Sequence, residues 1–124
     1  MKSNNAISDE SGATTSDGLF EMANLYPRTT GLPMTVWVGP RGNARHDVRI
    51  KVNMAHGNQM NIDKTAVVAL RPTAHLVAGR LSAEDQRLVF EWLRLNEAVV
   101  IGYWDGDLDT AELIQKLKPL SPNT

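Results

Sequence analysis

The chain has 124 residues, no cysteine and a formal net charge of −1 at pH 7. This length predicts a single domain with a modest core, and the absence of thiols excludes a disulfide framework and a thiolate metal site. The apolar runs are too short to span a bilayer or to form a signal peptide, so we expect a cytoplasmic protein without membrane contact.

The near-neutral total hides three segments of different charge. Residues 1–24 carry one Lys and four acids, a net charge of −3. Residues 25–80 carry eight Lys or Arg and two Asp, a net charge of +6, and hold all three histidines. Residues 81–124 carry four Lys or Arg and eight acids, a net charge of −4. A basic block of this kind indicates either an anionic partner or a basic surface that the rest of the chain neutralises.

The first part of the chain, residues 1–18, consists mainly of Ser, Thr, Asn, Gly and acids. It has almost nothing to bury against the entropy lost on ordering, about 1–2 kcal/mol per residue, so we expect a disordered acidic tail. A single domain is expected over residues 19–124. Its first segment, residues 19–26, holds an apolar cluster that either docks onto the domain or serves as a short binding motif.

Four segments have the pattern of β-strands. The cleanest alternation places Val48, Ile50 and Val52 on one face and charged residues on the other, which is typical of a half-buried strand. A loop rich in Gly and Pro, residues 39–43, joins it to the strand before it and predicts a β-hairpin. The expected strands are residues 34–38, 46–52, 65–70 and 75–78.

The last third of the chain has helical spacing. Ser82 is suited to cap a helix whose first turn carries acids, where the helix dipole favours them. Asn96 is placed to cap a second short helix, and Asp109 with Glu112 has the pattern of a capping box before a third helix, residues 110–118. This order predicts an α+β domain: a small antiparallel sheet of three to four strands followed by two to three short helices.

Two metal-site patterns fail on their spacing. The acids of residues 105–109 resemble the opening of an EF-hand loop, but Thr110 and Lys116 stand where that loop needs Gly and Glu. No two of the histidines have the spacing of paired ligands on one helix or strand. We therefore expect no metal and no cofactor. The histidines are His46, His56 and His75.

The segment around His46 holds parts that a metal-independent ribonuclease could use. A histidine can act as acid or base, and arginines can hold the phosphate. His46 is the catalytic candidate, but it is in phase with the core-facing Val48, and a regular strand would separate it from Arg45 and Arg49. No nucleophile or partner base can be placed.

The basic side chains of the hairpin region form a candidate nucleic-acid surface, since Lys and Arg neutralise phosphates. Aromatic residues in the basic block are few, with Tyr26 and Trp37 alone, and neither an RNA-binding signature nor a helix-turn-helix is evident. The alternative is a solvated sheet face. The candidate residues are Arg28, Arg41, Arg45, Arg49 and Lys51.

Residues 92–96, 103–106 and 109–113 resemble segments of small uncharacterised bacterial proteins. Such proteins pair a short β-hairpin region, often with a histidine-containing strand, with a C-terminal helical segment, and some are encoded in pairs like toxin and antitoxin. The resemblance implies an α+β fold and a bacterial origin. The histidine- and proline-rich strand of that group is not reproduced in residues 44–47, so the resemblance implies no activity.

The expected function is a non-enzymatic binding or regulatory module that acts through a protein partner or self-association. Trp92, Tyr103 and Trp104 belong either to the core or to a partner-binding groove. The alternative function is a nucleic-acid-binding protein or a toxin-like, metal-independent ribonuclease that uses the basic hairpin.

Overall fold

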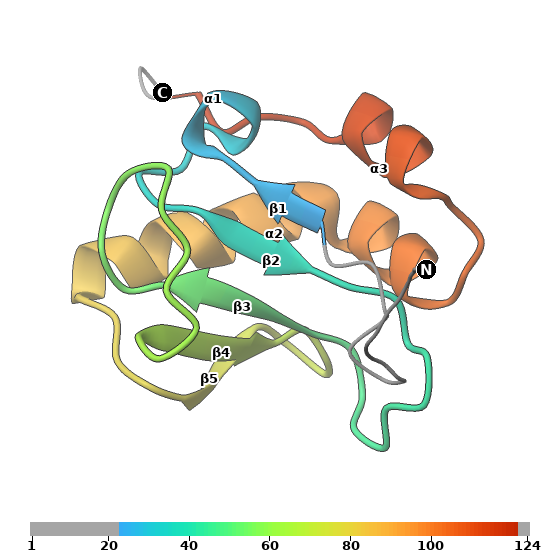
Figure 1. Cartoon of the computed structure of the whole chain (residues 1–124), viewed down its shortest axis with the longest axis horizontal. Coiled ribbons are helices and arrows are strands. Elements are labelled where there is room, and N and C mark those ends of the chain that lie inside the picture. Colours follow the sequence, from blue (N-terminus) through green and yellow to red (C-terminus); the bar gives the residue numbers. More distant parts are fainter. Residues whose placement is uncertain (1–22, 122–124) are drawn as a thin grey trace, which may run out of the picture.

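The computed structural model describes residues 23–121, so the expected tail over residues 1–18 lies outside the described residues. The described chain forms a five-stranded antiparallel sheet, in the order β1-β2-β3-β4-β5, and three helices (Figure 1). The α+β class is confirmed. The sheet has five strands, whereas the sequence predicted three to four. The strands are β1 (Ala23–Leu25), β2 (Val36–Val38), β3 (Arg49–Asn53), β4 (Thr65–Ala69) and β5 (His75–Ala78), and the helices are α1 (Pro27–Thr30), α2 (Ala83–Trp104) and α3 (Thr110–Lys116).

The two faces of the sheet have different environments because successive side chains of a strand point to opposite faces. Val36, Ile50 and Val68 belong to one face and are fully buried. Helix α2 lies across this face, behind the strands in the view of Figure 1. Among the described residues, no helix covers the other face, on which Trp37 and Lys51 are paired neighbours. This face is called the open face below.

Helix α2 supplies the centre of the core. The Ser82 hydroxyl accepts a hydrogen bond from the Asp85 backbone N–H at 3.0 Å, which is the predicted N-cap. From that point the helix runs 22 residues without a break, and Trp92 and Val89 on its buried side are 0% exposed. Burying such side chains stabilises the fold by roughly 1.5–3 kcal/mol each.

Asn96 does not cap a second helix, contrary to the prediction. It lies in the middle of α2 and is buried, and its side chain holds the segment after α3. The Asn96 Oδ1 accepts from the Lys118 N–H at 2.7 Å, and Nδ2 donates to the Lys118 carbonyl at 3.0 Å and to the Trp92 carbonyl at 2.9 Å. A partner 22 residues away satisfies this side chain, and local sequence does not reveal such a partner.

The additional strand is β1, which comes from the apolar segment predicted only to dock or to bind. It pairs with β2 at one edge of the sheet, Ala23 opposite Val38 and Leu25 opposite Val36. Three residues are too few to give a periodic signal.

Within residues 23–121, none of the helices combines the length and the apolar character needed to cross a membrane.

Candidate functional site

The loop between β2 and β3 is shaped by a tight turn and fastened to the end of α2. The Ala44 N–H donates to the Arg41 carbonyl at 2.8 Å, which closes a four-residue turn. Gly42 in this turn has φ 51°, a conformation that costs glycine little. The Arg41 N–H donates to the carbonyl of Trp104, the last residue of α2, at 2.9 Å. The turn therefore brings the loop beside Trp104.

A half-open pocket of about 320 Å³ lies between this loop and the open face of the sheet. We call it the basic pocket. Four basic side chains and two tryptophans line it: Arg41, His46, Arg49, Lys51, Trp37 and Trp104. No carboxylate is among the residues that line it. The sequence analysis placed the three cations in a candidate nucleic-acid surface and gave His46 as a catalytic candidate, and the fold brings all four into one pocket.

The strands fix the positions of the residues on the pocket floor. In β3, Arg49 and Lys51 alternate with the buried Ile50 and so face the open side. Lys51 is directly opposite Trp37 on β2, and its Nζ lies 5.7 Å from the Trp37 ring centroid, a cation–π arrangement. The Arg49 Nε and the Trp37 Nε1 are both shielded from solvent and have no hydrogen-bond partner. Lys51 and Trp37 give this floor a positive charge beside an aromatic ring.

His46 joins the pocket because β3 begins later than predicted. The regular strand starts at Arg49, and His46 lies in a bend before it, so the alternation that would have turned it toward the core does not apply. Its ring packs against Trp104 with centroids 5.5 Å apart. The Nδ1 lies 2.8 Å from the Asp47 carbonyl oxygen, which can only accept, so Nδ1 donates and Nε2 is left for a ligand.

Asp47, the acid next to His46, is engaged elsewhere. Arg71 holds it with two hydrogen bonds, from Nε at 3.0 Å and from Nη2 at 2.6 Å. These bonds are the largest cause that lowers the pKa of Asp47 from 3.8 to about 2, and a hydrogen bond from the Val48 backbone N–H and the positive charges of Arg71 and Arg41 contribute less. A carboxylate bound in this way is already satisfied by Arg71, and it does not line the pocket.

Two of the predicted cations lie outside the pocket. Arg45 is exposed and is not part of the lining. Arg28 follows β1 at the end where Leu25 pairs with Val36, whereas the pocket adjoins the Val38 end of β2. The Arg28 guanidinium lies 5.0 Å from the Tyr26 ring centroid. The predicted basic surface therefore divides, and three of its five cations converge.

The two tryptophans were not predicted as site residues. Trp37 lies between Val36 and Val38, and this alternation could have placed it on the same face as Lys51. Trp104 gives no such signal, because only the fold brings the end of α2 to the loop after β2. It was predicted as core or partner groove, and it is buried and lines the pocket as well.

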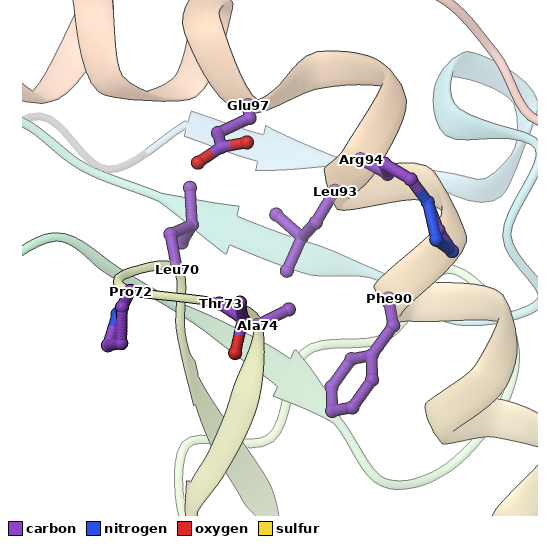
Figure 2. Close-up of a pocket in the computed structure, with 8 residues that line it drawn as sticks. All are labelled: Leu70, Pro72, Thr73, Ala74, Phe90, Leu93, Arg94 and Glu97. Carbon is purple, nitrogen blue, oxygen red and sulfur yellow. The ribbon is translucent and has the colours of Figure 1, made fainter.

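A second hollow, of about 310 Å³, lies between α2 and the turn that joins β4 to β5. Figure 2 shows Leu93 pointing from the helix toward Leu70 and Ala74, with Glu97 above them and the ring of Phe90 below. Arg94 is also part of the lining. This hollow, called the apolar groove below, lacks a cluster of like charges. It fits an apolar side chain better than an anion.

The remaining charged clusters are internally satisfied. A third hollow, near the start of α2, contains Arg87, which Glu84 binds at 2.8 Å and Glu91 at 3.3 Å. His56 lies 2.9 Å from the carboxylate of Asp85 and ties the loop between β3 and β4 to α2. Among residues 23–121, no group of three His, Cys, Asp or Glu is arranged to hold a metal ion.

Comparison with protein-family models, curated proteins and solved structures finds no match to this chain. The resemblance to small bacterial proteins with toxin–antitoxin-like partners therefore stays a prediction. What the site can do has to be inferred from its own geometry.

Proposed function

We propose that the chain is a non-enzymatic module that binds single-stranded nucleic acid through the basic pocket and the open face beside it. The supporting observation is the convergence of Arg41, Arg49 and Lys51 with Trp37 and Trp104, without a carboxylate in the lining. Cations of this kind neutralise phosphates and release counterions. Bases stack on aromatic rings, which contributes about 1–3 kcal/mol per base.

A single strand fits this arrangement better than a duplex. In a duplex the bases are stacked on each other and cannot reach Trp37, whereas a single strand can turn a base toward this half-buried ring. A pocket of about 320 Å³ is at the small end of ligand sites. It would hold one nucleotide of a strand that continues over the sheet.

Binding is favoured over cleavage because the pocket holds a single acid–base group of suitable chemistry. His46 could accept or donate a proton through Nε2, but phosphodiester cleavage by general acid–base catalysis uses a second group on the other side of the phosphate. The lining contains neither a carboxylate nor another histidine. The ribonuclease alternative thus has one of the two acid–base groups that it needs.

A titration of the full chain against labelled single-stranded RNA and duplex DNA tests the proposal. We expect tighter binding of the single strand, an affinity that falls steeply as salt rises, and intact RNA after incubation. Equal binding of both nucleic acids would point to charge alone. RNA cleavage that is lost in His46→Ala would replace the proposal by the ribonuclease alternative, and no binding at low salt would contradict both.

The second candidate is self-association, and the observation that favours it is the unpaired outer edge of β5, one of the two edge strands of the described sheet. No described strand pairs with the outer edge of β5, where Val77 is 45% exposed, and the apolar groove opens beside its first residues. Two copies could pair their β5 strands about a two-fold axis and continue the sheet. Sedimentation equilibrium of wild type and Val77→Lys tests this: a dimer lost in the variant supports it, and two monomers contradict it.

A further inference from the structure

None of the cations of the basic pocket forms an ion pair within the described part of the chain. The ion pairs of residues 23–121 involve Arg71, Arg87 and His56, and none involves Arg41, Arg49 or Lys51. Like charges gathered in one pocket repel each other, so an anion that enters the pocket gains the attraction of several cations at once. This chain carries a source of anions of its own in residues 1–22, which hold one Lys and four acids.

The described part of the chain begins next to the pocket. The first described residue, Ala23, is opposite Val38, and the residues that directly follow Val38, Gly39 to Arg41, form one wall of the pocket. Neighbouring strands lie about 4.8 Å apart, so the chain before Ala23 starts within a few ångströms of that wall. An extended chain covers up to about 3.5 Å per residue, which puts Glu21 and Asp17 within reach of the pocket.

We infer that the acidic segment of residues 1–22 binds the basic pocket of its own chain and competes there with nucleic acid. The chemistry of the segment parallels that of a nucleic acid, since carboxylates take the place of phosphates. Phe20, next to Glu21, offers a ring for the aromatic face of Trp37. Because the segment and the nucleic acid use the same cations, this regulation rests on the proposed function.

Tethering makes such a contact effective although each ion pair is weak. A segment held close to its site acts at an effective concentration in the millimolar range, without loss of translational freedom on binding. Exposed ion pairs are individually weak and screened by salt, so a polyanion with more charges can displace the segment. We therefore expect the module to bind polyanions that carry many charges and to discriminate against those that carry few.

The test compares three full-length proteins: wild type, a tail variant and a matched control. The tail variant carries Glu10→Gln, Asp17→Asn and Glu21→Gln. The control carries Asp63→Asn, Glu97→Gln and Asp107→Asn, which change the net charge equally at exposed acids away from the pocket lining. Because both variants keep the whole chain, neither depends on a truncated domain that folds alone.

Two readouts separate this inference from the proposed function. The first is affinity for single-stranded RNA at low salt, which should rise about five- to tenfold in the tail variant, a usual size for coupled sites, and less than about twofold in the control. The second is the position of the indole N–H resonances of Trp37 and Trp104 without nucleic acid. These should move in the tail variant and stay in the control.

Each outcome decides between the two ideas. Equal effects in the tail variant and the control would overturn the inference, because net charge alone would explain them. The inference would also be overturned if all three proteins bound RNA with equal affinity and the indole resonances did not move. The proposed function would stand in that case. Indole resonances that move in the tail variant alone, without RNA binding by any protein, would support the contact and sink the proposed function.

Discussion

Arg45 and Arg49 lie four residues apart in the chain and have different surroundings. Arg49 is the first residue of β3, faces the open side of the sheet and lines the basic pocket, whereas Arg45 is exposed in the preceding bend. Both changes to Gln remove one positive charge. A comparison of the two variants therefore separates the effect of position from that of net charge.

We expect Arg49→Gln to weaken binding of single-stranded RNA and to reduce the slope of log affinity against log salt by about 1, as for the loss of one phosphate contact. Arg45→Gln should keep most of the affinity and of the slope. Fluorescence anisotropy at several salt concentrations measures both quantities. Equal losses in the two variants would mean that the pocket has no special part in binding.

Asp47 and Arg71 give a prediction about pH. The pKa of Asp47 is lowered from 3.8 to about 2, mainly by the hydrogen bonds from Arg71. A depressed folded-state pKa contributes stability that is fully present above the unfolded value, near pH 4, and is lost as the pH falls through about 2. Both side chains are about half exposed, 53% and 44%, so solvent screens the pair and the contribution is modest.

Urea unfolding from about pH 6 to pH 2 should show wild type more stable than Asp47→Asn at the upper end, with the difference shrinking toward the lower end. Arg71→Gln should return the pKa of the Asp47 carboxyl toward its ordinary value, as followed by NMR titration. A wild-type pKa of Asp47 near 3.8 would show that the bidentate pair does not form in solution.

At the scale of elements, the segment after α3 is held by a side chain of α2. Asn96 satisfies both the N–H and the carbonyl of Lys118, and Leu117 and Leu120 on either side are buried. Asn96→Ala should destabilise the protein by about 1–3 kcal/mol, because it leaves backbone groups without partners. Amide exchange at Lys118 should accelerate more than that of β3. Unchanged protection of Lys118 would assign the docking to the two leucines alone.

Several elements could be predicted from the sequence because their cause is local. The alternation of β3 and β4, the Ser82 cap and the capping box at Asp109 each depend on residues a few positions apart. The continuity of α2 could not be predicted, since the polar group of Asn96 that suggests a break is satisfied by a distant segment. The start of β3 was misplaced because alternation continues through the bend at His46 although the strand pairing does not.

At the scale of the whole molecule, the five candidate cations of the basic block divide into three that line one pocket and two outlying arginines. The charge pattern indicated a region in which four of the candidate residues line one pocket: Arg41, His46, Arg49 and Lys51. It could not supply Trp104, which reaches the pocket only because α2 spans the sheet and ends beside the β2–β3 loop. The topology of the fold brings such distant residues together, and the local sequence around Trp104 does not show it.

The most direct test of the central claim uses the three tryptophans of the chain as reporters. Trp37 and Trp104 line the basic pocket, whereas Trp92 is 0% exposed in the core. Isotope-labelled full-length protein is titrated with single-stranded oligouridylate, and the indole N–H resonances are followed. The account predicts that the resonances of Trp37 and Trp104 move together while that of Trp92 stays. Unmoved indole resonances, or shifts confined to the residues of the apolar groove, would contradict it.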